Sequence, residues 1–305
     1  MFKIIATSIG APQVVKHNIA IPSDFEFYPY TKLEDIAAAR PDMILMGGWY
    51  IDNLVSFWNH KAIVGDCERV AIHWFGSDVM KCSHMYMNGE RKMFEYLRED
   101  RFLHIPCSEA NKEELEDRLG LSPCDPLIVP AQKRIERMPA ADRFAVAVYL
   151  PSAGLDFYNS GPIVDALEEL KIKTIFYHFL FKTYRIEFLG PHEFRYGLNR
   201  EEYEQVIADS AVLLRVPNHD GMSVGAAEFL MAGRQVVGTH DLPMCPAKAA
   251  LPVTKENLVE VLTKVRDEAT LVDESVSDQA RDMFDPALYR EGIAQRAKDK
   301  WGISI

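Results

Sequence analysis

Apolar runs of strand length alternate with amphipathic stretches along the first 120 residues of the chain. The runs predict strands at 2–7, 43–46 and 69–74, and the stretches predict helices at 33–40, 51–58 and 90–99. Short buried strands that alternate with helices favour a parallel sheet joined by right-handed crossovers. The beginning of the chain is therefore expected to fold as a Rossmann-like α/β domain.

A capped helix and a short strand are expected to close this domain. Ser108 is a suitable N-cap residue, charged residues follow it on the exposed face, and Gly120 supplies a C-terminal stop. An apolar run then predicts a strand at 126–130, and the polar residues 131–142 predict a linker.

The alternation of strands and helices begins again after the linker. Strands are predicted at 144–150, 173–177 and 211–214, and helices at 161–170, 201–211, 257–266 and 286–301. A second sheet domain of similar construction is therefore expected.

The stretch from Pro217 to Thr239 is the most informative part of the sequence, because it predicts a loop, a helix, a tight glycine turn and a strand. Asp220 lies in the loop after the strand at 211–214, and Glu228 follows eight positions later in the helix. Open α/β sheets bind anionic ligands at such loops and helix N-termini. Carboxylates at this place suit a ligand rich in hydroxyl groups, because they accept hydrogen bonds from sugar hydroxyls.

Composition and charge narrow the class of function. The 305 residues are 48% hydrophobic and 26% charged, with a formal net charge of −11. This balance argues against nucleic-acid binding through a broad basic surface, although a local basic patch stays open. No apolar run approaches the length of a membrane span, and the N-terminus lacks the layout of a signal peptide, so we expect a cytoplasmic protein without a membrane span.

Other common chemistries lack their sequence signatures. The five cysteines and nine histidines are scattered without metal-ligand spacing, so no metal site is expected. The odd number and wide spacing of the cysteines also favour a reducing compartment. The glycine-rich dinucleotide fingerprint, the P-loop and the Gly-x-Ser-x-Gly motif do not occur. Dinucleotide oxidoreductases, P-loop NTPases and serine hydrolases are thereby disfavoured.

The Pro217–Thr239 stretch resembles the donor-site signature of family 4 glycosyltransferases, and the capped helix at Ser108 is a second point of resemblance. The resemblance implies an α/β fold of the GT-B type, in which two Rossmann-like domains face each other across a cleft. It implies an N-terminal acceptor-side domain at 1–135 and a C-terminal nucleotide-sugar-binding domain at 136–285. A final helix at 286–305 is then expected to cross back to the N-terminal domain.

The resemblance also implies the reaction and the residues that carry it. The expected activity is the transfer of a sugar, with retention, from a nucleotide-diphosphate sugar that serves as co-substrate, without a cofactor or metal. Asp220 would orient the donor sugar and Glu228 the ribose. His73 would lie near the reacting carbon, together with the backbone of Gly221, Met222 and Ser223.

One departure from the family concerns the donor diphosphate. Family members commonly place an arginine and a lysine after the first strand of the second domain, whereas residues 150–159 of this chain contain neither. Lys182, Arg185 and Arg195 are the alternative donor-binding cations, and a solvated basic loop is the competing interpretation.

The predicted acceptor-side residues follow strands of the first domain, where small residues let a ligand approach the backbone. They are Gly47, Gly48, Gly76, Ser77 and Asp78. For Asp78 a role as a helix N-cap is the alternative.

Three other functions stay open. The chain could act on modified DNA bases, as some phage glycosyltransferases do, although its net charge does not favour nucleic acid as a partner. It could be a non-catalytic module that binds a nucleotide sugar, or an epimerase-like GT-B enzyme that needs no acceptor. The acceptor and the donor base are not indicated by any pattern.

Overall fold

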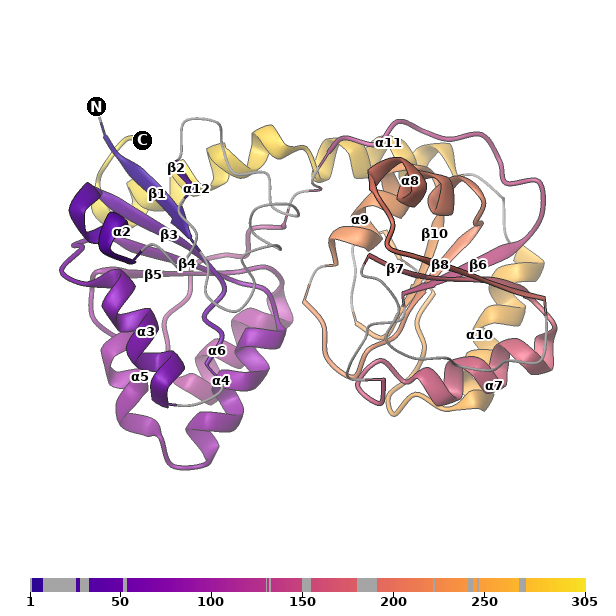
Figure 1. Cartoon of the computed structure of the whole chain (residues 1–305), viewed down its shortest axis with the longest axis horizontal. Helices are drawn as coiled ribbons and strands as arrows, with labels where there is room; N and C mark the ends of the chain where they lie inside the picture. The colour runs from indigo at the N-terminus through magenta and orange to yellow at the C-terminus, as the bar shows by residue number, and fades with distance from the viewer. Residues whose placement is uncertain are drawn as a thin grey trace. The chain divides into compact units, whose positions relative to one another are not determined.

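The computed structural model describes residues 2–7, 26–27, 33–51, 54–129, 131, 133–149, 155–179, 191–221, 223–240, 244–245, 247–268 and 273–305. The chain divides into two compact units (Figure 1). Unit 1 comprises Met1–Lys133, Asp220–Val224 and Phe284–Ile305, and unit 2 comprises Arg134–His219 and Gly225–Met283. The segment Asp220–Val224, which is part of the Pro217–Thr239 stretch, therefore belongs to unit 1, although the residues before and after it belong to unit 2.

Unit 1 contains a parallel sheet with the strand order β2-β1-β3-β4-β5. Its strands are β1 (Ile4–Thr7), β2 (Glu26–Phe27), β3 (Met43–Gly47), β4 (Val70–Trp74) and β5 (Phe102–Pro106). Its helices are α2 (Leu33–Ala39), α3 (Leu54–Val64), α4 (Ser77–Met87), α5 (Arg91–Leu97), α6 (Glu109–Leu119) and α12 (Pro286–Trp301).

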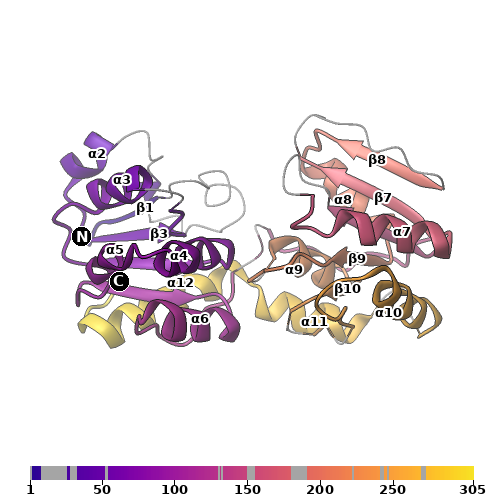
Figure 2. The same cartoon turned by 90° about the horizontal axis from the view of Figure 1, so that it is seen from below.

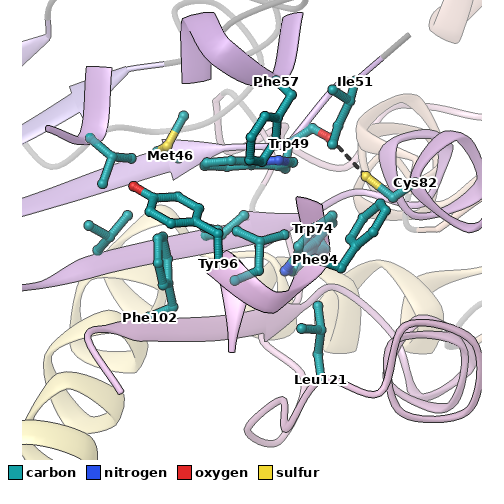
Figure 3. Close-up of a cluster of buried hydrophobic side chains, with 14 of the residues drawn as sticks. Met46, Trp49, Ile51, Phe57, Trp74, Cys82, Phe94, Tyr96, Phe102 and Leu121 are labelled. Carbon is teal, nitrogen blue, oxygen red and sulfur yellow. Dashed lines mark hydrogen bonds between the residues drawn. The ribbon is translucent and has the colours of Figure 1, made fainter. Parts of the chain in front are cut away.

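Helices cover both faces of this sheet. Viewed from below, α3, α4 and α5 lie in front of the strands and α12 lies behind them (Figure 2). The face toward α3, α4 and α5 carries an aromatic core that includes Trp49, Phe57, Trp74, Phe94 and Phe102 (Figure 3). This packing buries every residue of β3, β4 and β5, which explains why their sequences are apolar almost throughout.

Unit 2 contains a second parallel sheet, with the order β10-β9-β6-β7-β8. Its strands are β6 (Ala145–Tyr149), β7 (Lys173–His178), β8 (His192–Tyr196), β9 (Val212–Arg215) and β10 (Gln235–Gly238). Its helices are α7 (Ser160–Leu170), α8 (Arg200–Ala208), α9 (Val224–Met231), α10 (Lys255–Glu268) and α11 (Glu274–Met283). Alternate strand residues such as Val146, Val148, Val212 and Leu214 pack with α7 and α10 in one core.

The predicted class of fold, α/β with two Rossmann-like domains, is confirmed by these two parallel sheets. The strand predicted at 126–130 is wrong, because residues 126–129 form no strand and β5 at Phe102–Pro106 is the edge strand instead. Leu127 donates its backbone N–H to the Pro106 carbonyl at 2.9 Å and Cys124 donates to the His104 carbonyl at 2.9 Å, but this segment forms only an isolated bridge with β5. Strands β2, β5 and β8 and helices α4 and α11 had no prediction.

Candidate functional site

The carboxyl ends of parallel strands are where ligands bind in open α/β sheets, and each unit has one such edge. In unit 1 the edge is organised by Asp78, which lies in the first turn of α4 and is completely buried. Its carboxylate accepts hydrogen bonds from the backbone N–H groups of Trp49 (3.1 Å), Phe75 (2.9 Å), Gly76 (2.9 Å) and Val79 (3.0 Å). Asp78 thus ties the loop after β3 to the loop after β4.

The burial of Asp78 sets its protonation behaviour. Desolvation raises the pKa of Asp78 to about 6, although hydrogen bonds from backbone N–H groups, including those of Trp49, Phe75 and Val79, favour the charged form. The predicted acceptor-side role of Asp78 stays a prediction, and its hydrogen bonds identify it as the residue that positions its neighbours.

The glycines after β3 and β4 allow close contacts between loops. Gly48 has a φ of +79°, and a Cβ there would lie 2.3 Å from the ring of Tyr50, so the absence of a side chain lets Tyr50 fold back. Gly76 has a φ of +108°, and a Cβ there would lie 2.5 Å from the backbone nitrogen of Gly221. The structure thereby brings the predicted residues Gly76 and Gly221 together within unit 1.

Asp220 lies beside this contact. Burial and the negative charge of Asp78 raise the pKa of Tyr50, a hydrogen bond with the Ser77 hydroxyl opposes the shift, and Asp220 adds to it. Asp220 is thus within electrostatic reach of Tyr50. The predicted residues Ser77, Asp78 and Asp220 belong to one polar cluster at the carboxyl edge of the unit 1 sheet, and Tyr50 is a member that the sequence analysis missed.

The start of α6 completes this cluster. Ser108 caps α6 by accepting a hydrogen bond from the backbone N–H of Asn111, as predicted. A Cβ on Gly221 would lie 2.5 Å from the Sγ atom of Cys107 and 2.8 Å from the Oδ1 atom of Asn111. The Asp220–Gly221 backbone is therefore packed against the loop after β5 as well as the loop after β4.

His73 has a different environment from the one predicted. It is completely buried in β4, with Nδ1 2.7 Å from the Tyr289 hydroxyl and Nε2 2.9 Å from the Leu127 carbonyl. Nε2 must carry the proton to donate to that carbonyl, so Nδ1 accepts from the tyrosine. Burial lowers the pKa of His73 to about 3, and the ring is neutral. A catalytic role for His73 stays a prediction, and these contacts favour a brace between β4 and α12.

In unit 2 the central residue is Glu228, which lies in helix α9. Only 3% of Glu228 is exposed. Its Oε1 atom lies 2.7 Å from Nη1 of Arg200, and Arg200 also donates from Nε to Glu204 at 2.8 Å. Burial raises the pKa of Glu228, whereas the charge of Arg200 and hydrogen bonds from Arg200 and Tyr203 oppose that shift. Arg200 was missed by the sequence analysis, because nothing in a helix start 28 residues upstream indicates a partner for Glu228.

A tyrosine cluster lies at the carboxyl end of the unit 2 sheet. Tyr149 ends β6, Tyr177 lies near the end of β7, and their rings are 5.7 Å apart between centroids. Tyr158 packs on Tyr149 at 5.8 Å, and Tyr203 packs on Tyr177 at 5.6 Å. The negative charge of Glu228 contributes to raising the pKa of Tyr177 and of Tyr203. The cluster therefore borders the buried carboxylate.

The remaining predicted donor residues have varied settings. Arg195 lies on β8, where its guanidinium donates to Glu193 and Asp209, each at 2.6 Å. Ser223 is buried and directly precedes α9. Gly47 ends β3. Met222, Lys182 and Arg185 lie outside the described residues.

The described part of the chain contains neither a candidate metal site nor a candidate membrane-spanning helix. Within those residues no group of three or more His, Cys, Asp or Glu side chains could hold a metal ion. None of the helices found there has the length and apolarity to cross a membrane.

Comparison with known proteins gives the class of fold. No protein-family model matches the sequence, and no curated protein sequence matches it. The structure is similar to that of HepE from Anabaena in complex with UDP, with a TM-score of 0.68 and 12% identity over 98% of this chain and 100% of the other. It is similar to sucrose-phosphate synthase from Thermosynechococcus elongatus, with a TM-score of 0.73 and 10% identity over 98% and 99% of the two chains.

A third similar structure is WaaG, a glycosyltransferase involved in lipopolysaccharide biosynthesis, with a TM-score of 0.55 and 11% identity over 98% and 100% of the two chains. At these identities the likeness establishes the fold, which is the GT-B fold of glycosyltransferases. The narrower resemblance to family 4 stays a prediction.

Proposed function

We propose that this chain is a glycosyltransferase that moves a sugar, with retention, from a nucleotide-diphosphate donor to an acceptor. The observation that carries the proposal is the buried Glu228 carboxylate, held by Arg200 beside the tyrosine cluster at the carboxyl end of the unit 2 sheet. A carboxylate has more acceptor sites than its bond to Arg200 uses, so it can also accept hydrogen bonds from ribose hydroxyls.

Glu228 binds the nucleoside, with Arg200 keeping its side chain ionised and oriented. Asp220 contacts the donor sugar, and the contact between Gly76 and Gly221 holds the Asp220 loop in place. Tyr50, which is within electrostatic reach of Asp220, and its hydrogen-bond partner Ser77 contribute to the acceptor side. His73 has no chemical role in this scheme, because both of its ring nitrogens are bonded within the protein.

A thermal-shift panel tests the proposal. HepE, one of the similar structures, binds UDP and UDP-glucose, so UDP, GDP, ADP and their common sugar derivatives are the ligands to screen. A ligand that binds only the native protein raises its melting temperature by mass action. We expect one nucleoside diphosphate to stabilise the native chain and to lose that effect in Glu228→Ala.

The matched control is Glu260→Ala, which removes an exposed carboxylate from α10 of the same unit. Its thermal shift should equal that of the native chain. Stabilisation that persists in Glu228→Ala would remove the donor-site assignment. Nucleotide binding without consumption of any sugar nucleotide would instead support the non-catalytic module, which the missing Arg and Lys at 150–159 favour.

A further inference from the structure

The two oxygens of the buried Asp78 carboxylate have unequal hydrogen-bond partners. Oδ1 accepts from the backbone N–H groups of Phe75 and Gly76, each at 2.9 Å, and of Val79 at 3.0 Å, all at the junction of β4 and α4. Oδ2 accepts from the backbone N–H of Trp49 at 3.1 Å, in the loop after β3. Because more donors stabilise the negative charge on Oδ1, a proton added to this carboxylate is expected on Oδ2.

The loop after β3 is attached to α4 through that Oδ2 atom. Gly48, at the start of the loop, is bound to β4 instead, because its backbone N–H donates to the His73 carbonyl at 2.8 Å. Trp49 donates its N–H to Asp78, and its carbonyl accepts from the Sγ atom of Cys82 in α4 at 3.2 Å (Figure 3). A thiol is a weak donor, whereas a hydrogen bond to a carboxylate is assisted by its charge. Asp78 therefore makes the stronger attachment between Trp49 and α4.

The same loop carries Tyr50, a member of the polar cluster on the proposed acceptor side. Its hydroxyl is hydrogen-bonded to the Ser77 side chain at the start of α4, and the charge of Asp78 adds to the rise in its pKa that burial causes. The Nζ atom of Lys81 in α4 lies 5.9 Å from the centroid of the Tyr50 ring. The ionisable groups of the cluster around Asp78 are Tyr50 from the loop after β3, Lys81 from α4, Cys107 from the loop after β5 and Asp220 from the segment Asp220–Val224.

We infer that Asp78 is a proton-controlled clamp of the acceptor side: its carboxylate holds the loop after β3 on α4, and protonation of Oδ2 releases Trp49 and Tyr50. Burial places the pKa of Asp78 at about 6, so the clamp is closed at neutral pH and opens in mild acid. The bond from the Gly76 N–H to Oδ1 persists, so the contact between Gly76 and Gly221 is kept while Tyr50 moves. This inference rests on the proposed function and adds a positioning residue through which acid lowers turnover at the same site.

Nitrogen–proton NMR spectra of the backbone amides, recorded on the native chain from about pH 8 to about pH 5, test the release itself and need no substrate. We expect the Trp49 amide to shift with a midpoint of about pH 6 and to exchange its proton faster below that pH, because its acceptor becomes protonated. The amides of Phe75 and Gly76, which donate to Oδ1, should shift less. Asp78→Asn should abolish the Trp49 titration. Asp117→Asn, the same change at an exposed position of α6, should leave it unchanged.

The consumption of a sugar nucleotide over the same pH range tests the effect on turnover. Native turnover should fall about 10-fold from about pH 7 to about pH 5, as the charged fraction of Asp78 does. Asp78→Asn should have low turnover at neutral pH and lose this acid dependence. Its nucleotide dissociation constant should stay within about twofold of the native value at each pH, because Glu228 belongs to unit 2. His84→Gln, which removes an exposed histidine of α4, controls for histidine titration and should keep the native pH profile.

A Trp49 amide that does not titrate in this range, or that titrates equally in Asp78→Asn, would overturn the clamp whatever the turnover. A native acid dependence of turnover in Asp78→Asn would show that another group controls the reaction, and would overturn the regulatory role of Asp78. Should Asp78→Asn fail to fold, the native spectra decide, since a larger shift of Gly76 than of Trp49 contradicts protonation at Oδ2. A native chain that consumes no sugar nucleotide would overturn the proposed function and its regulation, while the Trp49 titration separately decides whether the clamp exists.

Discussion

The Nη1 atom of Arg200 lies 2.7 Å from Oε1 of Glu228, and this ion pair spans from the first residue of α8 to the middle of α9. Only 3% of the Glu228 side chain is exposed, compared with 29% for Arg200. The arginine also lies over the ring of Tyr203, 5.6 Å from its centroid. Arg200 therefore contacts both the Tyr203 ring and the Glu228 carboxylate of the proposed donor site.

Replacing Arg200 by methionine should destabilise unit 2 by about 3–5 kcal/mol at pH 7, because the buried carboxylate of Glu228 loses its counterion. The double variant Arg200→Met with Glu228→Gln should be more stable than Arg200→Met alone. Urea unfolding followed by circular dichroism measures both. Arg266→Met, which removes an exposed arginine of the same unit, should change stability by less than about 0.5 kcal/mol. Additive losses in the double variant would show that the two side chains do not act as a pair.

Asp220 and Glu228 should separate turnover from binding. Glu228→Ala should lose nucleotide affinity, because the ribose hydroxyls lose their acceptor. Asp220→Ala should keep most of the affinity and lose turnover, because it contacts the transferred sugar. Calorimetry gives the dissociation constant, and the rate of sugar-nucleotide consumption gives turnover. Native values for both quantities in both variants are incompatible with the assigned donor site.

The sequence predicted the fold class because buried strands and their connecting helices have a periodicity that local composition reveals. It also led to the strand end where Asp220 lies and to the Ser108 cap. It could not reveal the environment of His73, whose partner Tyr289 is 216 residues away.

Tertiary contacts also determine which partners the charged side chains have. The partners of Asp78 are backbone N–H groups, which have no sequence signature. Arg195 lies near a strand end, and only the structure shows that its guanidinium has two carboxylate partners.

Gly76→Ala should be far more damaging than Gly89→Ala, although both glycines have a positive φ. At Gly89 a Cβ meets nothing within 4 Å, so the cost is the backbone conformation alone, about 1–2 kcal/mol. At Gly76 the same atom would overlap the backbone nitrogen of Gly221 and displace the Asp220 loop. Urea unfolding and turnover together measure the difference. Equal stability and equal turnover in the two variants would mean that the Gly76–Gly221 contact has no role in placing Asp220.

Tyr289→Phe should destabilise unit 1 by about 1–3 kcal/mol, because the buried Nδ1 atom of His73 loses its hydrogen-bond donor. Unfolding of unit 1 is followed selectively by tryptophan fluorescence, since all four tryptophans belong to it. Tyr86→Phe, on a half-buried ring that packs on Phe94, is the matched control and should have a smaller effect. A loss no larger than that of the control would argue against the brace between β4 and α12.

Three buried histidines should make unit 1 sensitive to acid. Burial lowers the pKa to about 4 for His60, about 3 for His73 and about 4 for His104. An unfolded histidine has a pKa near 6.5, so below that pH the unfolded chain binds protons that the folded chain does not. The stability that neutral histidines provide is therefore complete above about pH 6.5 and is lost as the pH falls toward 3–4.

Asp78 opposes this trend, because its raised folded pKa of about 6 means that acidification between pH 6 and 4 relieves the cost of its buried charge. Three histidines against one carboxyl leave about two net protons, or about 3 kcal/mol per pH unit near pH 5. Urea unfolding followed by tryptophan fluorescence from pH 7 to 4.5 measures this slope. His104→Gln should reduce the slope by about one proton, whereas His84→Gln, at an exposed position of α4, should leave it unchanged. Equal slopes for His104→Gln and the native chain would show that His104 takes up its proton in the folded state.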